Sequence, residues 1–314
     1  MDDAWPHPGI HHRPAVVLDQ HPLPDRQYWL RLEAPQVAAS ARPGQFVHLV
    51  CGPDLTLPRP FSIFDADPAA GTIEILYRVV GIGTGRMTAW RKGTRITLTG
   101  PVGRPFAPIT PNAHFLLLAG GIGLAPLYFL ARRARVAGAA VTLLLGTESA
   151  PAFATTQSRL ALPGVPIAAG LALALLEEQG VLTRLAALHG AAGYFSGFVT
   201  DLARAYLAHI DPITRTGLRV CACGPTPMLK ATTRLLSTFG LEGELSLEAH
   251  MACGFGGCAG CAVPIYREGK MATATHESTK EQSRAWHYQR ACVDGPVFAA
   301  TQVAWAHYPA GEGQ

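Results

Sequence analysis

The sequence contains no block of basic residues and little charge of either sign. Only 15% of its 314 residues are Asp, Glu, Lys or Arg, and 26 basic residues face 22 acidic ones. Such a weak, dispersed charge argues against nucleic acid as the main partner. With 48% hydrophobic residues the chain is globular, and its length suffices for two or three domains with their own cores.

The sequence also lacks a long, uninterrupted hydrophobic run. Residues 105–131 carry no charge apart from a neutral His114, but four prolines and three glycines break this stretch. A continuous membrane-spanning helix needs about 20 residues without such breaks. Met1 is followed by Asp2, Asp3 and a stretch rich in Pro and His, which is not the pattern of a signal peptide. We therefore expect no membrane association.

Cysteine is too scarce and too unevenly placed for a disulfide framework. There are seven cysteines, and four of them follow the pattern Cys-x4-Cys-x2-Cys with a fourth after thirty intervening residues: Cys253, Cys258, Cys261 and Cys292. This indicates a reducing compartment, the cytoplasm, and is typical of a [2Fe–2S] cluster of the plant-ferredoxin type. The loop glycines let the backbone curl and turn its N–H groups toward the sulfurs. They are Gly254, Gly256, Gly257 and Gly260.

The cysteine pattern is also compatible with zinc, or with thiols that bind no metal. Four thiolates suit zinc, although zinc sites of this kind usually consist of two Cys-x2-Cys pairs, and only one pair here is that close. Unligated structural thiols are the third possibility. Cys51 and Cys221 lie at the ends of apolar runs, and we expect them to be small buried hydrophobic residues.

The first third of the chain has the pattern of a small antiparallel barrel. After an N-terminal arm at residues 1–13, short β-type runs punctuated by Gly and Pro recur between residues 14 and 110, with one or two helical turns at Gly85–Trp90. The predicted strands are Ala15–Leu18, Gln27–Leu32, Gln45–Val50, Phe61–Phe64, Thr72–Val79 and Arg95–Thr99.

Residues 111–243 have the pattern of a doubly wound α/β domain, and residues 244–314 that of a small cluster domain. Apolar runs at Phe115–Ala119 and Ala140–Gly146 suit parallel strands buried on both faces, separated by a helix that ends near Val136. A second unit comprises the strand Leu218–Ala222 and a helix to Phe239, with Met228, Leu235, Leu236 and Phe239 on one face. The stretch Leu160–Leu176, rich in Ala and Leu, is predicted to be a buried strand plus helix.

Glycine turns follow two predicted strands of this domain, Phe115–Ala119 and Leu218–Ala222. Gly120, Gly121 and Gly123 lie directly after one strand, and Cys223-Gly224-Pro225 lies after the other. Because both turns belong to the carboxyl edge of the sheet, they suit the pyrophosphate of a nicotinamide dinucleotide. A tight turn without a ligand is the alternative. Glu148, shortly after the second strand, favours NAD over NADP, unless it is only a solvated surface charge.

Within the barrel, polar and aromatic residues occur in two groups. Arg59-Pro60-Phe61-Ser62 joins a guanidinium that can grip phosphate to a hydroxyl that can bond a ring edge. Tyr77-Arg78 and Gly83-Thr84 add an aromatic ring, a second cation and a turn of small residues. By spacing alone, Arg59 could be a surface charge and Tyr77 a core aromatic.

In their order along the chain, these motifs resemble the ferredoxin–NADP reductase superfamily, and within it the electron-transfer subunits of NAD-dependent dihydroorotate dehydrogenases. The resemblance covers residues 14–298, and the cluster segment with Ala291-Cys292-Val-Asp-Gly-Pro-Val-Phe298 is its most specific part. It implies a flavin barrel at 14–110, an NAD domain at 111–243 and an oxidoreductase subunit of pyrimidine biosynthesis. Such subunits pass electrons from an FMN-containing catalytic subunit through a [2Fe–2S] cluster and FAD to NAD+, within a hetero-oligomer.

The resemblance also implies roles for individual residues. Cys223 would lie near the nicotinamide ring, as the one candidate catalytic residue. Cluster ligation falls to Cys253, Cys258, Cys261 and Cys292, and NAD binding to the two glycine turns. FAD would be held by Arg59, Pro60, Phe61, Ser62, Leu76, Tyr77, Arg78, Gly83 and Thr84.

One departure from the family pattern concerns the gap before Cys292. The extra residues, within about Gly269 to His287, are polar and charged and suggest an inserted loop, which loop-closure entropy tolerates at low cost. The longer gap approaches that of oxygenase-type NAD(P)H reductases, which deliver electrons from NADH through flavin and cluster to an acceptor protein. A carrier or regulatory subunit in which only the cluster works is a further alternative.

Overall fold

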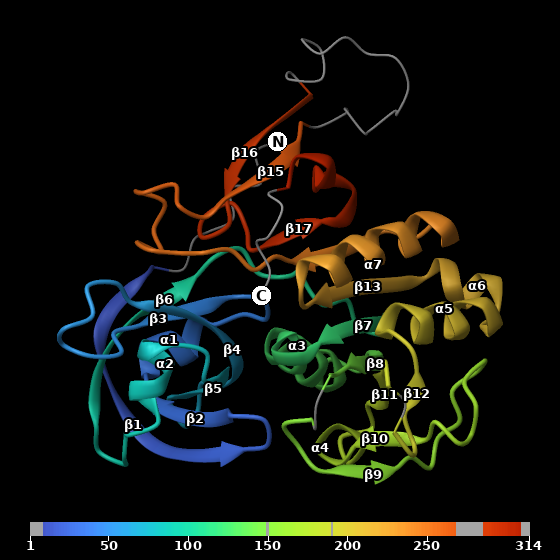
Figure 1. The fold of residues 1–314 in the computed structure, drawn as a ribbon, viewed down its shortest axis with the longest axis horizontal. Coiled ribbons are helices and arrows are strands. Elements are labelled where there is room, and N and C mark those ends of the chain that lie inside the picture. The colour runs from blue at the N-terminus through green and yellow to red at the C-terminus, as the bar shows by residue number, and fades with distance from the viewer. Residues whose placement is uncertain (1–8, 149–150, 190, 268–284, 309–314) are drawn as a thin grey trace.

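The computed structural model describes residues 9–148, 151–189, 191–267 and 285–308. Most of the predicted N-terminal arm and most of the predicted inserted loop lie outside these residues. Three parts of the chain are arranged as expected: a barrel, an α/β sheet and a C-terminal segment that sits across the top of both (Figure 1). Within the described residues no helix combines the length and the hydrophobicity needed to cross a membrane.

The barrel is closed, with strand order β1-β2-β5-β4-β3-β6 and all pairings antiparallel. All six predicted strands are confirmed. The first strand begins at His11, so it includes the last three residues of the predicted arm. The helix predicted at Gly85–Trp90 lies a few residues earlier. The elements are β1 (His11–Leu23), β2 (Gln27–Glu33), α1 (Pro35–Ser40), β3 (Phe46–Leu49), β4 (Arg59–Asp67), β5 (Thr72–Arg78), α2 (Ile82–Met87) and β6 (Arg95–Val102).

The α/β domain is built on a seven-stranded sheet in the order β12-β11-β8-β7-β13-β14-β17. Its first six strands are parallel, as the continuous apolar runs predicted, and helix α3 covers one face while α5 and α7 cover the other (Figure 1). The elements are β7 (His114–Gly120), η1 (Gly121–Gly123), α3 (Leu124–Val136), β8 (Ala140–Gly146), β9 (Thr155–Gln157), β10 (Leu171–Leu173), α4 (Ala174–Glu177), β11 (Leu182–Ala187), β12 (Phe195–Ser196), α5 (Val199–His209), α6 (Pro212–Thr216), β13 (Leu218–Cys223), α7 (Thr226–Phe239) and β14 (Gly243–Ser246).

The prediction for Leu160–Leu176 is wrong over most of its length. Residues 160–170 form no helix or strand, and Ile167 is 90% exposed. Only the end of the stretch, in β10 and α4, has the predicted structure. Pro163, Gly164 and Pro166 account for the difference, since these residues interrupt regular hydrogen bonding more strongly than Ala and Leu promote it.

The strands of the C-terminal segment belong to two different sheets. Strands β15 (Ala262–Tyr266) and β16 (Trp286–Arg290) pair with each other, but β17 (Val297–Ala299) pairs antiparallel with β14 and so extends the α/β sheet. Two short 3-10 helices follow, η2 (Ala300–Gln302) and η3 (Trp305–His307). The cluster segment is therefore anchored to the nucleotide domain through its backbone.

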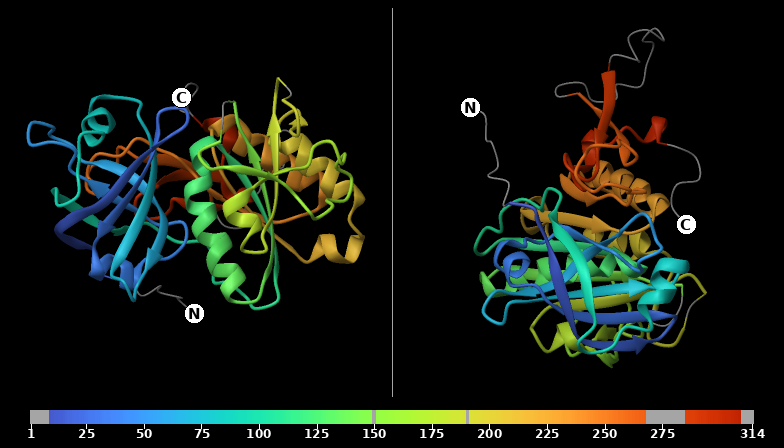
Figure 2. Two further views of the ribbon diagram at one scale, coloured as in Figure 1. Left: turned by 90° about the horizontal axis from the view of Figure 1, so that it is seen from below. Right: turned by 90° about the vertical axis from the view of Figure 1, so that its left-hand side faces the viewer.

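Helix α3 joins the barrel to the α/β sheet. The ring of Phe64 in β4 stacks on Tyr128 of α3, with ring centroids 4.0 Å apart and an interplanar angle of 4°. Arg132 of α3 forms an ion pair with the buried Asp65 of β4. Seen from below, α3 lies between the barrel and the rest of the molecule (Figure 2).

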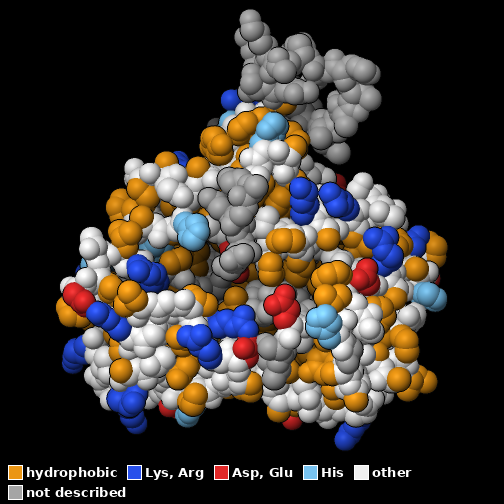
Figure 3. Space-filling model, viewed as in Figure 1, with side chains coloured by type: hydrophobic (Ala, Val, Ile, Leu, Met, Phe, Trp, Pro, Cys, Tyr) orange, Lys and Arg blue, Asp and Glu red, His pale blue; other side chains and the backbone are white. Residues whose placement is uncertain are grey.

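The described residues form no large area of one charge on the face shown in Figure 3, where basic and acidic side chains are interspersed with hydrophobic ones.

Candidate functional site

The two glycine turns meet at the point where the strand order of the sheet reverses. From β7 the chain proceeds outward through β8, β11 and β12, and then returns to the other side of β7 as β13. Gly120 ends β7, Cys223 ends β13, and the two strands are paired in parallel. In open α/β sheets the crevice at this switch point, beyond the carboxyl ends of the strands, is where ligands bind.

The turns approach each other so closely that no side chain could fit between them. A Cβ atom on Gly123 would lie 2.2 Å from the carbonyl oxygen of Cys223, and one on Gly224 would lie 3.0 Å from the Cα of Gly120. At Gly121 space is not the reason for glycine, since a Cβ there would meet nothing within 4 Å. Its positive φ of 53° is the reason, because other residues rarely adopt it. The turns thus form a bare backbone cradle, open at Gly121, at the start of helices α3 and α7. This cradle fits a dinucleotide pyrophosphate.

Cys223 lies in this edge but is a buried thiol. It is 3% exposed, and its Cα is opposite Ala119 in β7 and Ser246 in β14. Burial, together with the charge of Glu248, raises the pKa of Cys223, so the thiol stays protonated at neutral pH. The structure therefore gives this group no nucleophilic activation. Glu148 is exposed, two residues beyond the end of β8 on the same edge.

The flavin motif on β4 and β5 divides between the two faces of the barrel wall. Phe61 and Tyr77 point into the barrel core, where their rings contact edge to face. The Tyr77 hydroxyl donates a hydrogen bond to Gln20 at 3.2 Å, and its ring stacks on Tyr28. Tyr77 is thus the core aromatic that the sequence left as one possibility. Leu76 points outward and packs in the core shared with α3.

Arg59 and Gly83, 24 positions apart in sequence, are brought together. A Cβ on Gly83 would lie 3.3 Å from Cγ and Nε of the Arg59 side chain, which is half-buried and donates from Nη1 to the Leu57 carbonyl at 2.6 Å. Thr84 closes the turn: its hydroxyl oxygen accepts from the N–H of Val80 at 3.0 Å. Arg78 forms an ion pair with Asp25. Two guanidinium groups and a glycine turn at one end of the barrel wall fit a flavin with its pyrophosphate.

The four cysteine thiols interact with one another. Cys253 is hydrogen-bonded to Cys258 and Cys292 to Cys261, and the charge of Cys253 acts on Cys292. Although desolvation raises the pKa of Cys253, backbone N–H groups of Cys258, Phe255 and Gly257 lower it to about 6. Burial, followed by the neighbouring Cys261, raises the pKa of Cys292 to about 12. The Gly260 N–H donates to the Cys258 sulfur at 3.4 Å.

This donor set fits an iron–sulfur cluster. As the side chains stand, no group of three or more His, Cys, Asp or Glu residues in the described part of the chain is arranged to hold a metal ion. Gly254 and Gly256 have φ of 78° and 83°, and the amides that they turn inward are donors to sulfur, as the glycine-rich loop predicted. Cys258 is exposed, whereas Cys261 and Cys292 are buried.

His48 is a residue of the site that the sequence did not indicate. It is 1% exposed on β3, its Cα is opposite Pro60 of the flavin motif, and neither ring nitrogen has a hydrogen-bond partner among the described residues. Desolvation lowers the pKa of His48 to about 4, so the ring is neutral. In the sequence, a single histidine in a β-type run does not indicate a site residue. The position of His48 is recognised only from the structure, where β3 lies between β4 and the cluster loop.

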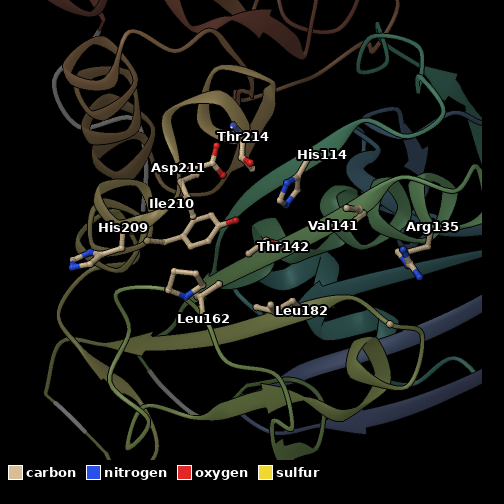
Figure 4. A pocket seen from close by; sticks show the side chains of 14 residues that line it. His114, Arg135, Val141, Thr142, Leu162, Leu182, His209, Ile210, Asp211 and Thr214 are labelled. Carbon is tan, nitrogen blue, oxygen red and sulfur yellow. Dashed lines mark hydrogen bonds between the residues drawn. The ribbon is translucent and has the colours of Figure 1, made fainter.

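Two cavities lie apart from these motifs. One of about 460 Å³ is at the amino ends of β7, β8 and β11, the opposite edge of the sheet from the glycine turns (Figure 4). The other, of about 560 Å³, lies between Arg104, Glu244 and Arg267 where the barrel, β14 and β15 meet. Neither is lined by a predicted site residue of the described ranges.

The family model and the similar sequences point to the same protein family. The model of the iron–sulfur cluster binding domain of dihydroorotate dehydrogenase B matches residues 248–304. The chain is 32% identical to the dihydroorotate dehydrogenase B (NAD+) electron transfer subunit of Desulforamulus reducens, over 93% of this chain and 97% of the relative. With the subunit of the same name in Shouchella clausii it shares 33% identity, over 92% of this chain and 96% of the relative.

Solved structures show the same arrangement of parts. A structure of an NADH-dependent reduced ferredoxin–NADP oxidoreductase, described in terms of flavin-based electron bifurcation, is 26% identical with a TM-score of 0.70, over 93% of this chain and 90% of that chain. The ferredoxin reductase of carbazole 1,9a-dioxygenase shares the fold, at 21% identity and a TM-score of 0.56, over 74% of this chain and 67% of that one. The chain thus belongs to the family of dihydroorotate dehydrogenase B (NAD+) electron transfer subunits.

Proposed function

We propose that this protein passes electrons from an FMN-containing catalytic subunit, in which dihydroorotate is oxidised, through a [2Fe–2S] cluster and FAD to NAD+. The observation that carries this proposal is that the cluster loop, the flavin motif and the glycine turns are connected by direct packing. The cluster loop lies on the barrel at β3, the flavin motif is on the adjacent β4, and β4 packs on α3, which starts at the glycine turn.

Each of these three parts has a separate task in this relay. Arg59 and Arg78 would hold the flavin pyrophosphate, and Pro60, Ser62, Leu76, Gly83 and Thr84 would form the rest of the flavin site, with Phe61 and Tyr77 supporting it from the barrel core. When bound, FAD supplies the conversion between the single electrons of a cluster and the electron pair of nicotinamide chemistry. The chain's own part is to hold the three groups in sequence and to keep water from the reduced flavin.

The glycine turns would bind the dinucleotide, with Gly120, Gly121, Gly123, Gly224 and Pro225 around its pyrophosphate. Cys223 would form the floor under the nicotinamide as a protonated thiol, since burial raises its pKa. Glu148 would face the adenosine ribose, where a carboxylate accepts hydrogen bonds from hydroxyls and repels a 2′-phosphate. Replacing Glu148 by arginine should lower the NADH-to-NADPH preference about tenfold or more, measured as the ratio of kcat/KM values.

The catalytic partner would dock on the side of Cys258. Of the four thiols only this one is exposed, and Phe255 in the same loop is 65% exposed. Cys261 and Cys292 are buried, so a partner would reach the cluster from the side of Cys258. An exposed aromatic side chain beside a redox centre is a suitable anchor for a partner protein. The cysteine pattern also favours a reducing compartment, the cytoplasm.

Composition and turnover of the purified protein test this proposal. One FAD and two irons with two acid-labile sulfides per chain are required. Zinc without flavin would contradict the proposal outright. The complex with its FMN partner should reduce NAD+ when dihydroorotate is supplied, whereas neither subunit alone should do so. If NADH reduces the flavin but electrons leave only toward an oxygenase-type acceptor, the oxygenase-type reductase is the correct function.

A further inference from the structure

A completely buried histidine lies between the flavin motif and the cluster loop. On the outer surface of the barrel wall, His48 is paired across β3 and β4 with Pro60, and across β3 and β6 with Thr99. Its neighbours along β3, Val47 and Leu49, belong to the barrel core, so the His48 ring points to the opposite side. There the ring of Phe46 is 5.6 Å away.

The other side of the His48 ring is covered by the cluster loop. A Cβ atom on Gly254 would come within 2.9 to 3.0 Å of three ring atoms, Cε1, Nδ1 and Nε2. The part of the ring that carries both nitrogens is therefore the part nearest the loop. Gly254 directly follows Cys253, the first cysteine of the cluster pattern. Only glycine leaves room for this contact.

Both nitrogens of His48 are buried without a hydrogen-bond partner in the described part of the chain. Buried polar groups are nearly always paired, because an unpaired one loses its bonds to water without replacement. A neutral imidazole carries one N–H donor and one acceptor. The described residues supply no partner for either nitrogen, and the adjacent loop carries the cysteine pattern of a cluster.

We propose that His48 is a positioning residue for the cluster, whose imidazole N–H donates a hydrogen bond to a sulfur of the cluster or of its ligand Cys253. This inference rests on the proposed function, because it requires the cluster to be present. Hydrogen bonds to the sulfurs stabilise the more negative, reduced state and so raise the reduction potential. Because β3 is paired with β4, the same bond ties the cluster loop to the strand that carries the flavin motif.

The test compares the loaded wild-type protein with His48→Phe, which keeps a ring of similar size but has no donor. We expect the cluster reduction potential of His48→Phe to shift to a lower value while the flavin potential stays unchanged. His48→Gln, which offers an amide N–H near the position of Nε2, should recover part of the shift. His287→Phe is the matched control: His287 also has a buried, unpartnered nitrogen among the described residues, but it lies on β16, and its replacement should leave the cluster potential unchanged.

A second readout does not depend on the potential. In protein labelled with nitrogen-15 in histidine, pulsed electron paramagnetic resonance of the reduced cluster should detect a weakly coupled histidine nitrogen, and this signal should vanish in His48→Phe. An unchanged cluster potential with no histidine coupling would overturn the inference, as would a shift confined to the flavin. Wild-type protein that binds no cluster would overturn the proposed function instead, so the two failures are distinguishable.

Discussion

Exposure separates the four cluster cysteines at the scale of single residues. Cys258 is exposed and Cys253 partly so, whereas Cys261 and Cys292 are 2% exposed. We expect Cys292→Ser to lose nearly all iron and the cluster absorbance, because a buried hydroxyl is a poor ligand where a thiolate is required. Flavin content and the reduction of flavin by NADH should be retained, measured by iron and sulfide analysis and by anaerobic titration.

Cys221→Ala is the control for this variant. Cys221 is also a buried thiol, but it lies in the middle of β13, away from the cluster loop. Its replacement should leave the iron content at the wild-type value. If Cys292→Ser kept its iron and its spectrum, the fourth ligand would have to be another residue of the chain.

The neutral His48 also makes stability depend on pH. Burial lowers the pKa of His48 from 6.5 to about 4. In the unfolded chain the ring takes up a proton near pH 6.5, but in the folded protein only near pH 4. The unfolded state therefore binds more protons between these values, and the free energy of unfolding falls as the pH is lowered through this window. The full loss is about 3 kcal/mol.

This contribution is measured by unfolding cluster-free wild type and cluster-free His48→Phe at about pH 7 and about pH 4.5, two values that enclose most of this window. The wild type should lose more stability on acidification than the variant, since phenylalanine does not titrate. Burial also lowers the pKa of His114, which adds acid sensitivity of the same sign, but both proteins share it and it cancels in the comparison. Identical losses in the two proteins would show that His48 does not remain neutral.

At the scale of elements, the glycine turns after β7 and β13 are a single structure. Gly123→Ala would bring its Cβ within 2.2 Å of the Cys223 carbonyl, so the turns must separate. We expect NADH to reduce the bound flavin at least tenfold less efficiently, because the backbone cradle for the pyrophosphate is distorted. Flavin and iron content should be retained. Stopped-flow reduction at several NADH concentrations distinguishes weaker binding from slower hydride transfer.

Gly138→Ala is a matched control. Gly138 has a positive φ of 82°, whereas Gly123 has a φ of −61°, so a Cβ at Gly138 would add backbone strain but would meet nothing within 4 Å; Gly138 lies beyond the far end of α3. This variant should cost about 1 kcal/mol of stability from backbone strain alone, without an effect on NADH. Equal loss of NADH reactivity in both variants would mean that contact between the turns is not the cause.

Elements with strong local patterns were predictable from the sequence. Residues 140–146 form the predicted strand, and helix α7 ends at Phe239 as expected, because a continuous apolar run and a following glycine each specify one structure. The strand β17 was not predictable: it has three residues, and its partner β14 is 51 positions earlier at the closest paired residues. Likewise the cysteines could be recognised from spacing, but the contact of His48 with Gly254 depends on tertiary structure.

At the scale of the whole molecule, the three parts share their cores. Phe64 and Leu76 of the barrel pack in one cluster with α3 and with Val297 of β17. A second cluster joins Phe46 of the barrel to α5, α7 and the cluster segment, beside the barrel's own core. The boundaries at residues 110 and 243 thus describe the order of the motifs, whereas the packing is continuous across them. We expect the three parts to unfold together.

Phe298→Ala tests this cooperativity. Phe298, in β17, is 5% exposed and fills the space beside Gly295, where a Cβ would lie 2.2 Å from its ring. Truncation should cost about 3–5 kcal/mol from lost burial and the cavity left behind. Since β17 belongs to the α/β sheet, the temperatures of cluster bleaching, flavin release and loss of far-ultraviolet circular dichroism should fall together by several degrees.

Tyr288→Ala is the control for Phe298→Ala: at a 59% exposed site on β16, it should leave all three temperatures within about a degree of wild type. Cluster bleaching that moves alone in Phe298→Ala would show instead that the segment is a separately folding unit, so that flavin and cluster are joined only by docking.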